Sequence, residues 1–273
     1  MNRRKLLRFG SLAALGSLAG CGTGRSDRTA EETFSDRYPA EGGLRVNVLG
    51  RNGSITATKV SGMDVVVEAV KRSRDGRSAL ERVDVEVTRT GGVLTARAVY
   101  PDVSPLSQPR VAVDFEVGIP AAAVAGVFES ANGDVVVRDV AGDARLASVN
   151  GRVEADNVDG FVSLRSGNGD VVATWTAGVD RAVSTNGAVD VDLRHTRGPV
   201  TAASTNGDVT VRPTAGLRAT FELRTVTGAI VVSGLTLERT TDAARHVVGR
   251  YNGGGDRVTA RTTNGDVRLR PLE

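Results

Sequence analysis

The sequence is short of the residues from which most active sites and cross-linked folds are built. Its 273 residues include one cysteine and two histidines, and its aromatic residues are one Trp, three Tyr and six Phe. A disulfide framework needs pairs of cysteines, and a zinc site needs several Cys or His ligands at short spacing. We therefore expect no disulfide, no metal site and no cofactor. The scarcity of aromatic residues predicts a thin core of Val, Ala, Leu and Thr.

An excess of charge of one sign is also lacking once the charges are located. The chain has 35 Lys and Arg against 32 Asp and Glu. Its first twenty residues hold Arg3, Arg4, Lys5 and Arg8 and no acid, which leaves 31 positive and 32 negative groups in the remainder. Binding to a phosphate backbone depends on a retained surplus of Lys and Arg. The composition therefore argues against a nucleic-acid partner.

The first twenty-one residues have the layout of a lipoprotein export signal. Basic residues precede an apolar run from Phe9 to Ala19, which is about half of the ~20 residues needed to span a bilayer. Leu18-Ala19-Gly20-Cys21 resembles the lipobox of prokaryotic lipoproteins. That resemblance implies cleavage before Cys21 and acylation of its sulfur. We predict a signal peptide over residues 1–20; whether export follows the twin-arginine route, which Arg3-Arg4 resembles, or the general route stays open.

The lipid at Cys21 makes the membrane a predicted partner and places the protein on the extracytoplasmic face. The stretch from Gly22 to Gly43 is polar and has no periodic apolar pattern. We predict that residues 21–42 form the lipidated cysteine and a flexible tether.

A nine-residue glycine repeat dominates the rest of the chain. Glycines follow one another at intervals of nine from Gly133 to Gly187, and every second one is preceded by Asn. A Ser or Thr stands two positions before each of these Asn residues, so the chemical repeat is [ST]-x-N-G with a period of about eighteen. We interpret the Asn-Gly pairs as structural turn and ladder positions: Asn132, Gly133, Asn150, Gly151, Asn168, Gly169, Asn186, Gly187, Asn206, Gly207, Asn264 and Gly265.

The apolar pattern between the glycines predicts strands. The second and fourth residues after each glycine are mostly small and apolar, which is strand spacing. This predicts an all-β fold over residues 43–273: a single-stranded β-solenoid, or β-helix, with about 18 residues per coil in two nonapeptide half-coils. A hairpin meander is the alternative, because Asn-Gly also favours tight hairpin turns. The repeated Asn and Ser/Thr columns favour the solenoid, in which equivalent positions stack.

Two local features carry further expectations. The apolar pattern slips after Gly178, which predicts a bulge. Pro271, with Arg268 and Arg270 beside it, suits an exposed terminal edge that does not pair with a neighbour, so the last repeat is expected at the end of the stack.

The motifs together resemble a known family. A strand ending in Ile119-Pro120 leads to Ser130-Ala131-Asn132-Gly133-Asp134-Val135, serial S-x-N-G repeats follow, and the chain closes with Asn252-Gly253-Gly254-Gly255 and Thr262-Thr263-Asn264-Gly265-Asp266-Val267. This arrangement resembles the putative adhesin domain family of prokaryotic cell-envelope proteins over roughly residues 43–273. The resemblance implies a β-solenoid and a surface location. It transfers no site residue, because the recurring residues are corners and ladder positions.

Two other interpretations of the sequence involve a bound ligand. Asp follows Asn-Gly in several repeats, which invites a calcium hypothesis, but the chain lacks the GGxGxD turns of calcium-binding rolls. These acids occupy alternate coils, a spacing that avoids stacked like charges. Trp175, Phe221 and Tyr251 would form a sugar-facing patch in a polysaccharide-cleaving enzyme, but we favour local packing at corners as their role.

We therefore expect a non-catalytic surface lipoprotein, not an enzyme, that serves binding, adhesion or envelope structure. Its partner would be an envelope protein or a glycan. A carbohydrate-active β-helix enzyme is one alternative and would need carboxylates and a basic residue converging in a groove. A self-assembling envelope scaffold is the other and would need an uncapped edge.

Overall fold

The computed structural model describes residues 29–102 and 108–272. The predicted signal peptide and Cys21 lie outside these residues. The described chain folds into two β-sheets and one short helix, α1 (Arg77–Leu80), so the all-β prediction is confirmed. None of the described residues form a helix long and apolar enough to cross a bilayer.

The two sheets have eleven and twelve strands. The first, sheet A, contains in spatial order β1 (Ala30–Pro39), β4 (Asp64–Ser73), β7 (Val111–Ile119), β3 (Ile55–Lys59), β9 (Val135–Arg138), β11 (Val153–Asp156), β13 (Val171–Thr174), β15 (Val189–Leu193), β17 (Val209–Pro213), β23 (Val267–Leu269) and β19 (Ile230–Val232). The second, sheet B, contains β20 (Glu238–Ala243), β21 (His246–Tyr251), β18 (Ala219–Thr227), β22 (Asp256–Asn264), β16 (Val200–Ala203), β14 (Gly178–Asn186), β12 (Phe161–Asn168), β10 (Ala144–Asn150), β8 (Ala123–Asn132), β2 (Leu44–Leu49), β6 (Val93–Val99) and β5 (Asp84–Thr90).

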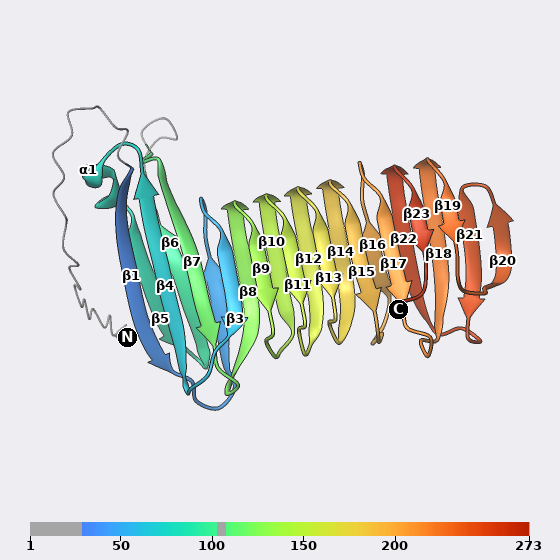
Figure 1. Ribbon diagram of the computed structural model, residues 1–273, viewed down its shortest axis with the longest axis horizontal. Helices are drawn as coiled ribbons and strands as arrows, with labels where there is room; N and C mark the ends of the chain where they lie inside the picture. Colours follow the sequence, from blue (N-terminus) through green and yellow to red (C-terminus); the bar gives the residue numbers. More distant parts are fainter. Residues whose placement is uncertain (1–28, 103–107, 273) are drawn as a thin grey trace, which may run out of the picture.

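The middle of the molecule is a regular stack of parallel strands along its longest axis (Figure 1). From β8 to β15 the chain alternates between the sheets, and each strand from β8 to β13 pairs in parallel with the strand about eighteen residues further on. Asn132, Asn150, Asn168 and Asn186 are consecutive register partners. A hairpin meander would pair its strands antiparallel, so that alternative is wrong for this segment.

The core is a single thin layer between the sheets. Along β9, β11 and β13 buried residues alternate with half-buried or exposed ones. Val135, Val153 and Val171 stack on one another through the register of these strands. Small β-branched side chains suit this space, since a β-strand holds their single preferred rotamer without strain.

Bulky side chains fill the core towards the two ends of the stack. Phe115 and Phe128 are fully buried in the N-terminal part, and Phe221 is fully buried in the C-terminal part. The expected thin core of Val, Ala and Leu therefore describes the middle of the stack.

The C-terminal end departs from the expected order. The last repeat, β22 and β23, lies between β16/β17 and β18/β19 rather than at the end of the stack. The strands near the C-terminus therefore occupy interior places in Figure 1, with β18 to β21 beyond them. The prediction of an exposed terminal edge at Arg268–Pro271 is wrong, because β23 pairs with β17 on one side and with β19 on the other.

The N-terminal end corrects the predicted tether. Residues 30–39 form β1, which runs antiparallel to β4 along ten register partners. Phe34 and Tyr38 lie on one side of β1 and pack against the core. The flexible-tether prediction for residues 21–42 is therefore wrong from Ala30 onward: polar residues alternate there with just enough apolar ones to cover the edge of sheet A.

The predicted bulge near Gly178 is present. Val162 pairs with Val179, whereas the next residue, Ser163, pairs with Arg181, so Asp180 is the extra residue. The bulge returns Ala182 to the core after the polar pair Asp180-Arg181.

Candidate functional site

The Asn-Gly corners form a continuous ladder of side-chain amides. Each Asn donates its Nδ2 hydrogen to the Oδ1 atom of the Asn in the neighbouring coil, at 2.7–2.8 Å. The ladder contains Asn52, Asn132, Asn150, Asn168, Asn186, Asn206 and Asn264 in that spatial order. Because each amide both donates and accepts, the hydrogen bonds polarise one another along the row.

The Ser and Thr column supports the same corner from inside. Ser148 Oγ donates to the carbonyl of Gly133 in the preceding coil at 2.8 Å, and the equivalent bond recurs at every repeat. These hydroxyl residues are buried. Their hydrogen bonds remove the cost of burying a polar group.

The glycines at the corners are required because there is no room for a side chain there. A Cβ built on Gly151 would lie 2.2 Å from the carbonyl oxygen of Gly133. The distances at Gly133, Gly169, Gly187, Gly207 and Gly265 are 2.2–2.4 Å. Any side chain would therefore push successive coils apart.

The aspartates after Asn-Gly also bind within the stack. Asp134 Oδ1 accepts a hydrogen bond from the backbone N–H of Arg152, and Asp170 Oδ1 accepts one from Ala188, both at 2.8 Å. These carboxylates therefore accept hydrogen bonds from the backbone of the neighbouring coil at the corner. Among the residues that the structure describes, no three Asp, Glu, His or Cys side chains gather as metal ligands.

The insertion of the last repeat changes one expectation about these acids. Asp208 and Asp266 lie in adjacent coils, so the acids do not all alternate. Arg268 lies between them and donates to both carboxylates. The hydrogen bond from Arg268, followed by that from the Asp266 N–H, lowers the pKa of Asp208 below its usual value. Arg268, which lies in the same coil as Asp266, thus offsets the repulsion between the carboxylates of Asp208 and Asp266.

The aromatic residues do not form a common sugar-facing patch. Phe221 and Tyr251 are buried, with ring centroids 6.1 Å apart. Trp175 is 53% exposed at a corner on the opposite side of the coils from the Asn ladder. The predicted local packing is therefore confirmed for Phe221 and Tyr251, whereas the Trp175 ring is largely exposed and contacts Arg194, whose Cζ lies 5.6 Å from the ring centroid.

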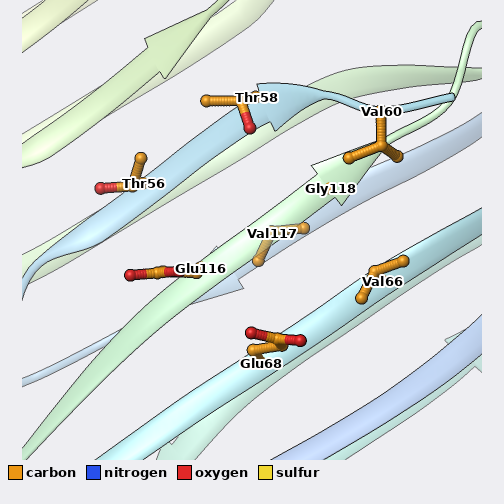
Figure 2. Close-up of a pocket in the computed structure, with 8 residues that line it drawn as sticks. All are labelled: Thr56, Thr58, Val60, Val66, Glu68, Glu116, Val117 and Gly118. Carbon is orange, nitrogen blue, oxygen red and sulfur yellow. The ribbon is translucent and has the colours of Figure 1, made fainter.

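A shallow depression of about 250 Å³ brings two carboxylates together. Glu68 on β4 and Glu116 on β7 are register partners, and their side chains lie on the outer surface of sheet A (Figure 2). The remaining lining consists of Thr, Val and Gly residues. The carbohydrate-active alternative predicted a basic residue beside the carboxylates in a groove. The residues lining this depression include no basic side chain.

The outer faces of the two sheets differ in whether their arginines are paired with acids. On sheet A, Arg138 pairs with Glu154, and Arg212 pairs with Asp190 and Asp192, so every arginine on strands β9 to β17 has an acidic partner. On sheet B the outward positions of β10, β12, β14 and β22 hold five arginines: Arg145, Arg165, Arg181, Arg257 and Arg261. This difference was not predicted from the sequence, because the register of the stacked strands decides which side chains share a face.

A protein-family model and several solved structures are similar to this chain. The family model described as Toastrack DUF4097 matches residues 113–270, which is more than half of the chain. No curated protein matches the chain. Solved structures with a similar outline include a putative cell adhesion protein from Clostridium sporogenes, which has 10% identity, covers 90% of this chain and 100% of its own, and gives a TM-score of 0.42.

Two further structures are similar to the same degree. A putative adhesin from Bacteroides fragilis has 11% identity, covers 87% of this chain and 97% of its own, and gives a TM-score of 0.40. A putative lipid binding protein from Parabacteroides distasonis has 10% identity, covers 88% and 97%, and gives a TM-score of 0.34. With TM-scores below 0.5, these likenesses do not extend to function.

Proposed function

Because this chain belongs to the Toastrack DUF4097 family, we propose that it is a non-catalytic surface lipoprotein with an adhesin-like domain. In this proposal the domain is a β-solenoid with coils of about 18 residues in its middle part, and it binds an envelope protein or glycan on the extracytoplasmic side. The proposal rests on one observation above all: the polar side chains of the corners are used within the stack, while the broad outer faces of the sheets are exposed.

The shape of the molecule suits binding by a surface more than by a pocket. Among the described residues, the depression beside Glu68 and Glu116 is shallow, and so is another of about 360 Å³ at the N-terminal end beside Arg72 and Arg74. Small-molecule sites are typically concave and mostly apolar. A long flat face fits an extended partner.

A lipid at Cys21 would hold this domain close to the membrane. Eight residues separate Cys21 from Ala30, the first residue of β1. A fully extended segment of this length spans about 30 Å. The tether is therefore shorter than the sequence alone indicated, and the N-terminal end of the stack faces the bilayer.

The edges of the sheets do not favour the self-assembling scaffold. At the C-terminal end sheet B closes with the antiparallel strands β21 and β20, and β20 carries Glu238, Arg239 and Asp242. Charged edge strands discourage pairing with another chain. The edge of sheet A at that end is the three-residue strand β19.

Metabolic labelling with a palmitate analogue tests the anchor. We expect label in the wild type, and none in Cys21→Ala, which also leaves the membrane fraction. External protease on intact cells should degrade the wild type if the domain faces outward. Labelling of Cys21→Ala, or an unlabelled wild type, would contradict the lipoprotein proposal.

A further inference from the structure

The outer face of sheet B carries an array of arginines that the fold itself does not use. We call Arg145, Arg165, Arg181 and Arg261 the arginine face. All four are exposed and alternate along their strands with buried residues, so they point away from the core. Their placement on four different strands makes the face a property of the stacked coils.

The arginines of the arginine face have few ion pairs or hydrogen bonds with other residues of the described chain. Arg165, Arg181 and Arg261 have no ion pair or side-chain hydrogen bond with any residue that the structure describes. Arg145 has a single contact, 3.5 Å from Glu129, and its side chain is 68% exposed. An exposed pair of this kind contributes little.

Acids are scarce across this face. On the outer side of β10, β12, β14, β16 and β22, all of them described strands, the one acid is Asp180 in the bulge, and both of its carboxylate oxygens are held by Arg197. The fifth arginine, Arg257, is paired with Glu222 on β18. The four residues of the arginine face therefore form a continuous positive field.

The register arranges these arginines in two rows along the long axis. Arg145, Ser163 and Arg181 are consecutive partners in the first row, which continues through Thr201 and Thr259. With strands about 4.8 Å apart, Arg145 and Arg181 are separated by about 10 Å at the backbone. The second row lies about 7 Å away along the strands.

The second row completes the array. It holds Arg165 and Arg261, joined through Val183 and Ala203 as intermediate partners. Three strand spacings separate its two arginines, or about 14 Å at the backbone. The residues between the arginines of the two rows have short side chains: Ser163, Val183, Thr201 and Ala203.

We propose that the arginine face binds a linear anionic polysaccharide that carries carboxylates at regular intervals, lying along the stack across its strands. Guanidinium groups bind carboxylates with two parallel hydrogen bonds. The hydroxyls of Ser163, Thr201 and Thr259, in line with the arginines, supply partners for sugar hydroxyls. A sugar unit is comparable in length to the strand spacing, so carboxylates two units apart meet Arg145 and Arg181 in the first row, and the carboxylate of the unit between them meets Arg165 in the second row.

Other polyanions fit this face less well. Proteins that hold single-stranded nucleic acid stack its bases on aromatic side chains, and the rows of the arginine face contain none. Membrane-surface binding combines basic residues with large apolar anchors. The outward apolar residues of these rows are Ala and Val, which do not reach beyond the arginines.

This inference rests on the proposed surface-binding function and is tested separately from the anchor. The full chain of the Cys21→Ala variant is titrated with polygalacturonate, a linear polymer with one carboxylate per sugar, at low salt. Dextran is the neutral control. We expect binding of polygalacturonate and not of dextran, and a weakening as salt rises from about 50 to about 200 mM, because exposed charges are screened.

Two triple variants with the same change in charge locate the site. Arg145→Gln/Arg165→Gln/Arg181→Gln should weaken polygalacturonate binding by about tenfold or more, because it removes three charged donors. Arg37→Gln/Arg74→Gln/Arg245→Gln changes three exposed arginines outside the face and should alter binding by less than about twofold. Thermal unfolding verifies that both variants remain folded.

Three outcomes would overturn the inference. One is the absence of polygalacturonate binding at low salt, and another is an equal loss of binding in both triple variants. The third is tighter binding of duplex DNA, or of phosphatidylglycerol vesicles over phosphatidylcholine vesicles, that disappears in the first triple variant. Each of these leaves the palmitate labelling of Cys21 unaffected, so failure of this inference is distinct from failure of the lipoprotein proposal.

Discussion

Asn264 donates its side-chain amide to Asn206 at 2.7 Å, although the two residues are 58 positions apart in the chain. The other steps in the regular part of the ladder join residues 18 or 20 apart. The chain therefore passes over the place for one coil, builds β18 to β21 beyond it, and returns to fill the gap with β22 and β23. The last repeat joins the middle of the molecule to its C-terminal end.

This insertion predicts that the C-terminal residues hold the stack together. A chain ending at Gly255 lacks β22 and β23, so β16 and β18 lose their shared partner. We expect limited proteolysis to cleave residues 214–255 rapidly in this truncation, since the exposed ends can no longer pair. A chain that ends at Arg270 keeps both strands and should resist cleavage like the wild type. Equal resistance of the two truncations would contradict the observed strand order.

The Asn ladder predicts a measurable loss of stability at a single position. Asn150→Leu removes hydrogen bonds to Asn132 and Asn168 and leaves their amides partly unpaired. We expect the free energy of unfolding to fall by about 1–2 kcal/mol, measured by urea denaturation. Val149 is the neighbouring exposed residue, and Val149→Leu should stay within about 0.5 kcal/mol of the wild type. A fully stable Asn150→Leu variant that had lost surface binding would instead give the ladder a role in ligand recognition.

The corner glycines predict a steric effect that is independent of hydrogen bonding. Gly151→Ala places a methyl group where the carbonyl of Gly133 lies, and the backbone of both coils must shift. We expect a loss of more than about 2 kcal/mol in the free energy of unfolding, because overpacking of this kind costs 1–3 kcal/mol or more. Gly216→Ala is the matched control, since no atom lies within 4 Å of its added Cβ. Similar stability of the two variants would show that the coils tolerate the methyl group.

The Asp208–Arg268 pair predicts a dependence of stability on pH. The pKa of Asp208 is lower in the folded protein than its usual value, first because of the hydrogen bond from Arg268. A group with a lowered folded pKa contributes stability above its unfolded pKa, about 3.9, and this contribution is lost as pH falls through the folded value. Stability should therefore decrease below about pH 4. The side chain of Asp208 is 44% exposed, so solvent screening keeps the contribution below about 1 kcal/mol.

Urea denaturation at pH 6 and pH 3 measures this contribution. In Asp208→Asn the free energy of unfolding at pH 6 should be lower than in the wild type, and its decrease towards pH 3 should be smaller. Asp84 is an exposed residue on β5 with no ion pair to a described residue. In Asp84→Asn the free energy of unfolding should therefore decrease towards pH 3 as steeply as in the wild type. If Asp208→Asn lost stability with pH as steeply as Asp84→Asn, the pair would contribute nothing.

Local chemistry made the corner predictable from the sequence. Asn132, Asn150 and Asn168 recur at a fixed interval because each must match the side chain directly above and below it. The slip at Gly178 was equally readable, since a single extra residue reverses which side chains face the core. In each case the pattern reflects contact between equivalent residues of adjacent coils, and such contacts repeat with the sequence.

The N-terminal strand β1 could not be predicted from its own residues. Residues 30–39 carry too few apolar side chains to signal a strand by themselves, and β1 forms because the edge of β4 offers a full row of unpaired backbone groups. The placement of the last repeat is similar. Its sequence matches any interior coil, and only the competition among strand edges decides which neighbours it joins.

The sequence by itself determined that this protein is all-β, that its corners are Asn-Gly ladders, and that its core is thin, because each of these follows from strand alternation and from coil-to-coil identity. Only the tertiary structure decided the order of the coils at the two ends and the gathering of arginines with few acidic partners on one face. Arg145, Arg165, Arg181 and Arg261 are scattered among acids along the chain, and the register of the stack brings them together on one surface. Net charge is a sum over the chain, whereas the field at a surface depends on which side chains share it.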